Sequence, residues 1–246
     1  MIIRNSFLDI YGDLLIHDFG TILQNIQSSL ELSSVYLNKP EKMRKYLNII
    51  NKQVIRGIQL ISNVTNLSKV DNSKNSLQYI DVLQVLKKSI KFIESSFQGN
   101  NIKIDFNNSV PKNPSSNGLY IQGNKLLQNV FENIIFNAIY HNENPNIQIL
   151  IRISKENLNN IQFVRIEFID NGAGITDARK KTIFQKSSEI QEYKKGMGFG
   201  LTLVKKLIRK YNGYIWVEDK VKEHYNRGSN FVIMIPELCE KPYILT

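Results

Sequence analysis

The chain has 246 residues, 42% of them hydrophobic, and no apolar run near the roughly 18 residues that span a bilayer, so we expect one large or two modest domains and no membrane span. A single cysteine, Cys239, excludes an internal disulfide and a cysteine metal cluster, and it favours a reducing, cytoplasmic location. The net charge of +10 is scattered among acidic residues without a basic recognition helix, so we expect a solvated surface and no nucleic-acid partner.

The N-terminal part carries two long helical patterns. Apolar residues recur at three- and four-residue steps from about 7 to 36, and again from 43 to 67. Residues 38–40 (Asn, Lys, Pro) break the pattern, so residues 1–72 are expected to form an antiparallel helical hairpin. The near-heptad spacing favours pairing with a second copy into a four-helix bundle, a homodimer. The alternative is that the apolar stripes pack on the rest of the same chain.

Beyond a polar linker at 71–76 the period of the pattern changes. Strand-like and helical segments mix without strict alternation, and Asp81 is placed to cap a helix. This pattern predicts an α+β fold for residues 77–246, an α/β sandwich with helices on one face of a sheet. We expect strands at 79–80, 102–106, 147–153, 163–170, 214–218 and 230–235, helices at 82–97, 125–140 and 201–211, a loop at 111–118 and a variable segment at 176–195.

Two glycine-bearing segments of the second domain are typical of phosphate binding. They are residues 170–175 (DNGAGI) and residues 194–201 (KKGMGFGL). The second runs straight into the helix that is expected from Leu201, so its bare backbone amides lie at a helix N-terminus. Their glycines are Gly172, Gly174, Gly196, Gly198 and Gly200. Taken alone, either segment is explained equally well by a tight turn.

Three polar side chains near these segments could bind a metal ion or a nucleotide base. Asn133 and Asn137 stand four apart on one face of a predicted helix, where an amide oxygen is a hard ligand suited to Mg²⁺ that carries substrate phosphates. Asp170 ends an apolar strand, where its carboxylate can accept a hydrogen bond from an exocyclic amine such as adenine N6. The alternatives are local capping for the amides and an ordinary turn for the aspartate.

In this order the segments resemble the ATP-binding domain of sensor histidine kinases, within the superfamily that includes Hsp90, type II topoisomerases and mismatch-repair ATPases. Residues 133–142 are similar to the family's N box, 170–175 to its first glycine box, 183–184 to a reduced F box and 196–201 to its second glycine box. The resemblance covers about residues 77–236 and implies ATP and Mg²⁺ as cofactors, with Asn137 as the metal ligand. It implies a binding site of Asn133, Asn137, His141, Asp170, Gly172, Gly174, Ile175, Lys194, Lys195, Gly196, Gly198, Gly200 and Leu201.

Several positions depart from the family pattern. Tyr140 stands where a phosphate-contacting lysine is frequent, so that role passes to Lys194 or Lys195, or is lost. His141 falls where Tyr or His is common, and either a phosphate contact or a structural role is open to it. Asn230 replaces a frequent threonine beside the adenine.

The hairpin contains a second resemblance, to the family's phosphoacceptor box. His17 is followed by the acidic Asp18 and, three residues later, by Thr21, whereas Gly20 and Ile22 stand where many members carry Arg and Pro. A neutral nitrogen of His17 can attack the γ-phosphorus of ATP while Asp18 takes or orients the proton on the other ring nitrogen. The resemblance implies that Thr21 positions water against a partner's aspartyl-phosphate.

These motifs predict a dimeric histidine kinase core that autophosphorylates His17 from Mg-ATP and transfers the phosphoryl group to an aspartate on a response-regulator receiver domain, with phosphatase activity in addition. One alternative is an ATPase of the same superfamily, whose glutamate base would stand where this chain has Asn133. Glu132 is one residue away, about 100° around the helix. The other alternative is a scaffold with a degenerate ATP site.

Overall fold

A computed structural model describes residues 6–71, 77–97, 101–110, 118–184 and 199–238. The chain divides into two compact units, Met1–Thr65 with Lys186–Phe199 and Asn66–Gln185 with Gly200–Thr246. The predicted site residues Lys194, Lys195, Gly196 and Gly198 lie outside the described residues.

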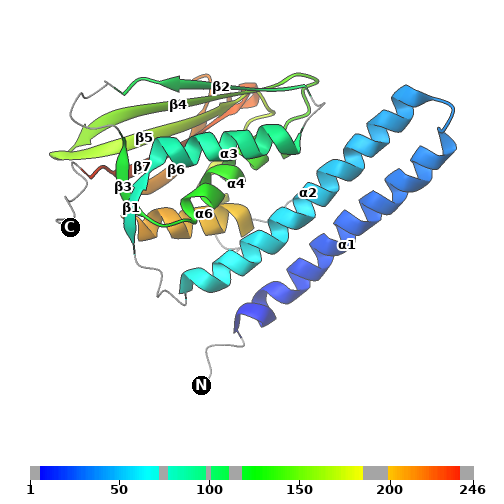
Figure 1. Ribbon diagram of the computed structural model, residues 1–246, viewed down its shortest axis with the longest axis horizontal. Coiled ribbons are helices and arrows are strands. Elements are labelled where there is room, and N and C mark those ends of the chain that lie inside the picture. Colours follow the sequence, from blue (N-terminus) through cyan, green and yellow to red (C-terminus); the bar gives the residue numbers. More distant parts are fainter. Residues whose placement is uncertain (1–5, 72–76, 98–100, 111–117, 185–198, 239–246) are drawn as a thin grey trace, which may run out of the picture. The chain divides into compact units, whose positions relative to one another are not determined.

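The first unit contains most of the predicted helical hairpin, whose last residues, 66–71, belong to the second unit (Figure 1). Helix α1 covers Ser6–Val35, and helix α2 begins at Pro40 and ends at Asp71. The break comes where it was predicted, and the Tyr36 carbonyl accepts a hydrogen bond from the Lys39 N–H at 2.9 Å in the connecting turn. Across the turn, the ring of Tyr36 stacks on the ring of Tyr46 of α2, with centroids 5.8 Å apart. Further along, Ile22 of α1 lies against Gly57 of α2, so the two helices run antiparallel.

Much of the hairpin's apolar surface is exposed. Ile22 and Leu60 are buried, at 3% and 7% exposed. Other apolar side chains of the two helices have exposures from 42% to 74%: Ile16, Leu23, Leu30, Leu32, Val35, Val54, Ile58, Ile61 and their neighbours in the turn region Leu37 and Leu47. One hairpin therefore leaves apolar stripes uncovered.

The second unit is built on a five-stranded sheet in the order β2-β4-β5-β7-β6. Its strands are β2 (Ile102–Asn108), β4 (Ile147–Leu158), β5 (Ile161–Asp170), β6 (Tyr214–Asp219) and β7 (Ser229–Pro236). Strands β2 and β4 are parallel, and the other neighbours are antiparallel. A separate antiparallel pair joins β1 (Gln78–Asp81) to β3 (Tyr120–Gly123).

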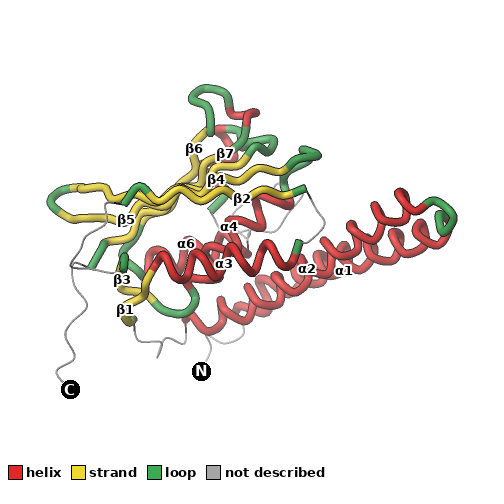
Figure 2. Tube along the Cα trace, turned by 45° about the horizontal axis from the view of Figure 1, so that its top comes forward, coloured by secondary structure: helices red, strands yellow, loops and turns green. Residues whose placement is uncertain are grey.

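Helices cover one face of this sheet, as predicted (Figure 2). They are α3 (Val82–Ser96), α4 (Leu127–Tyr140) and α6 (Phe199–Lys210). Asp81 caps α3, because its Oδ1 accepts the backbone N–H groups of Leu83 and Gln84 at 3.0 and 3.3 Å. The α+β class is thus confirmed for this unit.

Three short elements were not predicted from the sequence, and one of them is the 3-10 helix η2 (Tyr225–Arg227). Strand β3 is only four residues long, and the short helix α5 (Asp177–Thr182) lies within the segment to which no element was assigned. The connection between β4 and β5 is a two-residue turn at Asn159 and Asn160, both with positive φ of 51° and 63°. Such turns match the twist of the strands they join.

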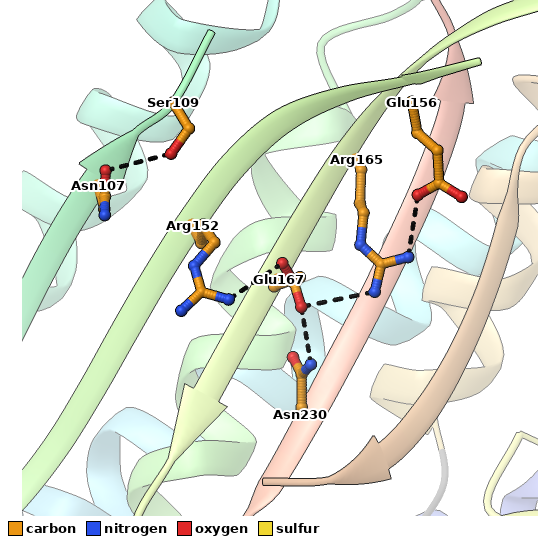
Figure 3. Close-up of polar contacts among 7 residues, drawn as sticks. All are labelled: Asn107, Ser109, Arg152, Glu156, Arg165, Glu167 and Asn230. Carbon is orange, nitrogen blue, oxygen red and sulfur yellow. Dashed lines mark hydrogen bonds and ion pairs between the residues drawn. The ribbon is translucent and has the colours of Figure 1, made fainter.

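On the other face of the sheet the described residues form no helical layer, and paired polar side chains lie there (Figure 3). Glu167 is 8% exposed and accepts hydrogen bonds from Asn230 at 3.0 Å and Arg165 at 3.5 Å. Arg152 approaches its other oxygen at 3.6 Å. The Arg165 guanidinium also lies 5.5 Å from the centre of the Trp216 ring. The stems of these long side chains cover the surface of the sheet. A cavity of about 660 Å³ is lined by Arg152, Glu167 and Asn230, among others.

Candidate functional site

Asp170, at the end of β5, is held by three protein donors. Its Oδ1 accepts the backbone N–H of Gly172 at 2.7 Å and that of Ser229 at 3.2 Å, and its Oδ2 accepts the Ser229 hydroxyl. The side chain is on the helix-covered face of the sheet and is 4% exposed. The carboxylate therefore joins the glycine turn to the start of β7 and keeps acceptor capacity on Oδ2.

Asn230 and Ser229 lie on opposite faces of β7. Asn230 was expected beside the adenine, but its amide bonds to Glu167 on the opposite face of the sheet, where Ile169 is its cross-strand partner. Ser229 presents its hydroxyl to Asp170 instead. Successive residues of a strand point to opposite faces, and residues two apart share a face. Ser229 therefore lies on the same face as the buried Phe231, which is the face that the helices cover.

Two backbone segments, the turn after Asp170 and the connection before β7, approach each other so closely that each needs a glycine. Gly174 has φ of +70°, and a Cβ atom there would collide with the Tyr225 carbonyl oxygen. Gly228 has φ of +106°, and a Cβ atom there would collide with the Asp170 carbonyl oxygen. Both positions combine a left-handed backbone with direct contact between main chains. Ile175 follows, half-buried, so the first glycine segment forms one compact turn against the β6–β7 connection.

A cluster of asparagines ties the glycine turn to the segment that follows α4. Asn171 Oδ1 accepts the Asn142 amide at 2.8 Å and the Gln148 backbone N–H at 2.9 Å. Asn171 Nδ2 donates to the Asn146 carbonyl at 2.9 Å. These bonds fix Gly172 relative to the end of α4. Asn171 and Asn142 are positioning residues that were not singled out in the sequence.

Helix α4 carries the two predicted amide side chains. Asn133 is 5% exposed and donates to the Asn129 carbonyl at 2.7 Å, which is a local role. Asn137 is half-buried, and among the described residues its side-chain amide has no hydrogen-bond partner. His141, exposed, follows the last turn and donates its backbone N–H to the Asn137 carbonyl at 3.1 Å. The Asn137 amide oxygen is therefore available to a ligand.

Tyr140 belongs to an aromatic cluster. Its ring stacks on Phe136, with centroids 5.8 Å apart and an interplanar angle of 15°. It meets Phe97 edge-on at 6.2 Å. The side chain that replaces the frequent lysine thus packs between α3 and α4. Phe184 of the expected F box is also in an aromatic contact, 6.1 Å from Phe231.

Glu132 is a buried carboxyl on the same helix. It is 6% exposed and accepts a hydrogen bond from Gln128 at 2.8 Å. Burial raises its pKa above the ordinary value of 4.5, and the hydrogen bond from Gln128 only partly opposes this shift. The side chain is committed to a partner one turn earlier on α4.

The shifted pKa predicts a pH dependence of stability. A carboxyl whose pKa is higher in the folded chain binds more protons there, so the free energy of unfolding falls as pH rises from the unfolded pKa through the folded one. Glu132→Gln should remove this fall and be more stable than the wild type above that window. Denaturant unfolding between pH 4 and 8 measures the difference, with the exposed Glu143→Gln as control. Parallel curves for Glu132→Gln and the wild type would contradict the prediction.

In the hairpin, His17 is exposed and Asp18 is buried. The His17 side chain is 78% exposed, and its Nδ1 lies 3.4 Å from Asp18 Oδ1. The Asp18 side chain is only 12% exposed, and its other oxygen lies 3.8 Å from a guanidinium nitrogen of Arg56 on α2. Thr21 donates its hydroxyl hydrogen to the His17 carbonyl at 3.0 Å. Sequence reasoning found the α1 residues and missed Arg56.

Gly200 and Leu201 of the second glycine segment lie in the first turn of α6, which begins two residues earlier than expected, at Phe199. Within the described ranges, no group of three or more His, Cys, Asp or Glu side chains is arranged to hold a metal ion. A magnesium site at the candidate nucleotide site would therefore use the Asn137 amide oxygen on α4 and oxygens of the phosphates that the ion accompanies. None of the helices in the described part is long and apolar enough to cross a membrane.

Residues 123–238 match the family described as histidine kinase-, DNA gyrase B- and HSP90-like ATPase. The sensor-like histidine kinase ycf26 of Pyropia yezoensis is 29% identical over 89% of this chain, which spans 34% of that relative. The adaptive-response sensory kinase SasA of Gloeothece citriformis is 27% identical over 94% of this chain and 58% of its own. The chain therefore spans less than two thirds of either relative.

Solved structures agree on the fold. The histidine kinase AdeS of Acinetobacter baumannii aligns over 89% of this chain and 97% of its own, with a TM-score of 0.53 and 21% identity. The mycobacterial sensor histidine kinase MprB aligns over 65% of this chain and 97% of its own, with a TM-score of 0.54 and 17% identity. Residues 123–238 thus match the histidine kinase-, DNA gyrase B- and HSP90-like ATPase family, and the chain as a whole is similar to sensor histidine kinases.

Proposed function

We propose that the chain autophosphorylates His17 from Mg-ATP and transfers the phosphoryl group to an aspartate of a response-regulator receiver domain. The observation that carries this proposal is an exposed imidazole, His17, with a buried carboxylate 3.4 Å from its Nδ1. When Nδ1 carries the proton and donates it to Asp18, Nε2 keeps its lone pair and faces away from the carboxylate. A nucleophilic nitrogen is thereby presented to solvent.

In the proposed step, Nε2 of His17 forms a bond to the γ-phosphorus of ATP. The bond between that phosphorus and the β–γ bridging oxygen breaks, and the electron pair leaves on ADP. The Nδ1 proton is drawn toward Asp18 Oδ1, which offsets the positive charge that develops on the ring. Transfer to the receiver aspartate then breaks the nitrogen–phosphorus bond and restores the imidazole.

The nucleotide is proposed to lie on the second unit, between α4 and the glycine turn. Asp170 Oδ2 has one protein donor, Ser229, and retains capacity for the amino group of adenine. Asn137 offers an unpaired amide oxygen at the end of α4 where Mg²⁺ would be held together with the phosphates. Mg²⁺ would neutralise the charge that develops on the departing diphosphate.

Thr21 is proposed to serve the reverse reaction. Its hydroxyl hydrogen is bonded to the His17 carbonyl, so its oxygen lone pairs remain to accept a hydrogen bond from water. A water held there, one helical turn from His17, is placed to attack the aspartyl-phosphate of a bound receiver domain. We place these reactions in the cytoplasm, where a receiver domain and ATP are both present.

The proposal is tested with γ-labelled ATP and Mg²⁺. We expect label that is stable to base and lost in acid, as a phosphoramidate is. Release of labelled phosphate without a labelled chain would instead favour the superfamily ATPase. Nucleotide binding with neither label nor release would favour the degenerate scaffold, for which the packing of Tyr140 in place of lysine is the supporting observation.

We also propose that the hairpins of two copies pair into a four-helix bundle, which would cover the exposed apolar stripes. Ile58→Asp should then weaken the dimer at least about 100-fold, because each copy loses about 1.5 kcal/mol or more of apolar burial. Ile58 is 60% exposed in the single chain. Sedimentation of the full chain measures the change, and Ile161→Asp, at a β-hairpin position that is 51% exposed, is the control. A wild-type chain that sediments as a monomer at micromolar concentration would refute the bundle.

A further inference from the structure

We propose that Arg56 of α2 is a positioning residue that holds the Asp18 carboxylate in place for the reaction of His17. The inference rests on the proposed function, because it assigns a role within the same phosphotransfer step. It adds a third side chain, from the second helix of the hairpin, to a motif that lies entirely on the first. All the residues involved are in one compact unit of the chain.

The two oxygens of Asp18 have different partners. Oδ1 lies 3.4 Å from His17 Nδ1, and Oδ2 lies 3.8 Å from a guanidinium nitrogen of Arg56. The exposed fractions of the three side chains are 78% for His17, 12% for Asp18 and 32% for Arg56. The carboxylate is thus a nearly buried bridge between an exposed imidazole and a partly covered cation. A charge removed from water to this degree needs a partner, and Arg56 supplies it.

The local sequence explains why the cation comes from α2. Residues 17–21 of α1 (His, Asp, Phe, Gly, Thr) contain no lysine or arginine, and Gly20 extends nothing toward Asp18. On α2 the residue after Arg56 is Gly57, where an added Cβ would lie 3.8 Å from Ile22 Cγ2. The helices therefore pack closely one turn beyond Asp18, and the Arg56 side chain crosses only a short gap.

This contact decides which way the carboxylate points. The Asp18 side chain has rotamers that turn it along α1 or toward solvent, and in those it no longer faces His17. Binding of Oδ2 by Arg56 selects the rotamer that aims Oδ1 at Nδ1. That contact favours the tautomer with the proton on Nδ1 and leaves Nε2 as the nucleophile. Arg56 acts through Asp18 and touches neither the imidazole nor the phosphate in this arrangement.

Kinetics of Arg56 variants of the full chain test this role. We expect Arg56→Ala to lower the maximal rate of autophosphorylation about tenfold, because the base is less often in place. The KM for ATP should stay unchanged, because the nucleotide site is on the other unit. Arg56→Lys keeps the charge and should recover part of the rate. The exposed Arg44→Ala on the same helix should match the wild type.

A double-mutant cycle separates positioning from general stability. If Arg56 acts through Asp18, Arg56→Ala should cost almost nothing further in an Asp18→Asn chain. Fully additive losses, or a wild-type rate in Arg56→Ala, would overturn the inference while leaving the proposed function intact. If Arg56→Ala does not fold, Arg56→Lys and Arg56→Gln must differ in rate for the inference to stand. A wild-type chain that takes no label on His17 would instead refute the proposed function itself.

Discussion

Replacing His17 by glutamine is expected to abolish labelling of the chain by γ-labelled ATP. Glutamine has similar length and polarity, but its amide nitrogen has no basic lone pair to attack phosphorus. The side chain is 78% exposed, so the substitution removes little packing and the hairpin should keep its stability. Autoradiography of the full chain after incubation with Mg-ATP measures the result.

Nucleotide affinity provides the internal control for this variant. Because His17 lies on the hairpin and the candidate nucleotide site on the other unit, ATP should bind the His17→Gln chain within about twofold of the wild type by calorimetry. The exposed His224→Gln is the matched control and should label normally. Label that persists in His17→Gln would show that another residue is the acceptor.

Asp170→Asn is expected to weaken ATP binding at least about 100-fold. The carboxylate accepts from Gly172, from the Ser229 backbone and from the Ser229 hydroxyl, and it is proposed to accept from adenine as well. An asparagine must point its NH₂ group at some of these donors, so a charge-assisted hydrogen bond is replaced by a clash of two donors. The loss should be present with and without Mg²⁺, because the adenine contact does not involve the metal.

Two comparisons sharpen this test. Ser229→Ala removes only one protein donor from Asp170 and should leave most of the affinity. Asp105→Asn, an exposed aspartate on the open face of the same sheet, should leave all of it. Calorimetry with ATP and with a nucleotide that lacks an exocyclic amine at that position reads out the contact directly. Equal affinities for ATP in Asp170→Asn and the wild type would show that adenine binds elsewhere.

Local signals in the sequence predicted local structure well. The break at residues 38–40, the Asp81 cap and the glycine turn after Asp170 each depend on residues within a few positions of one another, and each was found as expected. Strand β3 was missed because its four residues pair with β1, some forty positions earlier in the chain, and no periodic pattern of their own marks them.

The features of the candidate site that the sequence did not predict have the same origin. Asn230 lies on the face of β7 opposite Asp170, and the sequence does not state which face is covered, because one residue of offset exchanges the faces. The contact between Asp18 and Arg56 joins positions 38 residues apart, and only the antiparallel packing of α1 on α2 brings them together. The chemical role of a single residue can be predicted from the sequence. A contact between side chains of two helices cannot, because it depends on the register in which the helices pack.

The mixed pairing of the sheet has a consequence for how this unit folds. The turn at Asn159 and Asn160 lets β4 and β5 zip together locally, an event that takes about 1 to 10 μs in hairpins. Strand β2 is made earlier but pairs only with β4, across an intervening segment that contains β3 and α4. Closing that long loop costs chain entropy before any pairing rewards it. During synthesis β2 must therefore wait for its partner β4, which emerges later as part of the β4–β5 hairpin.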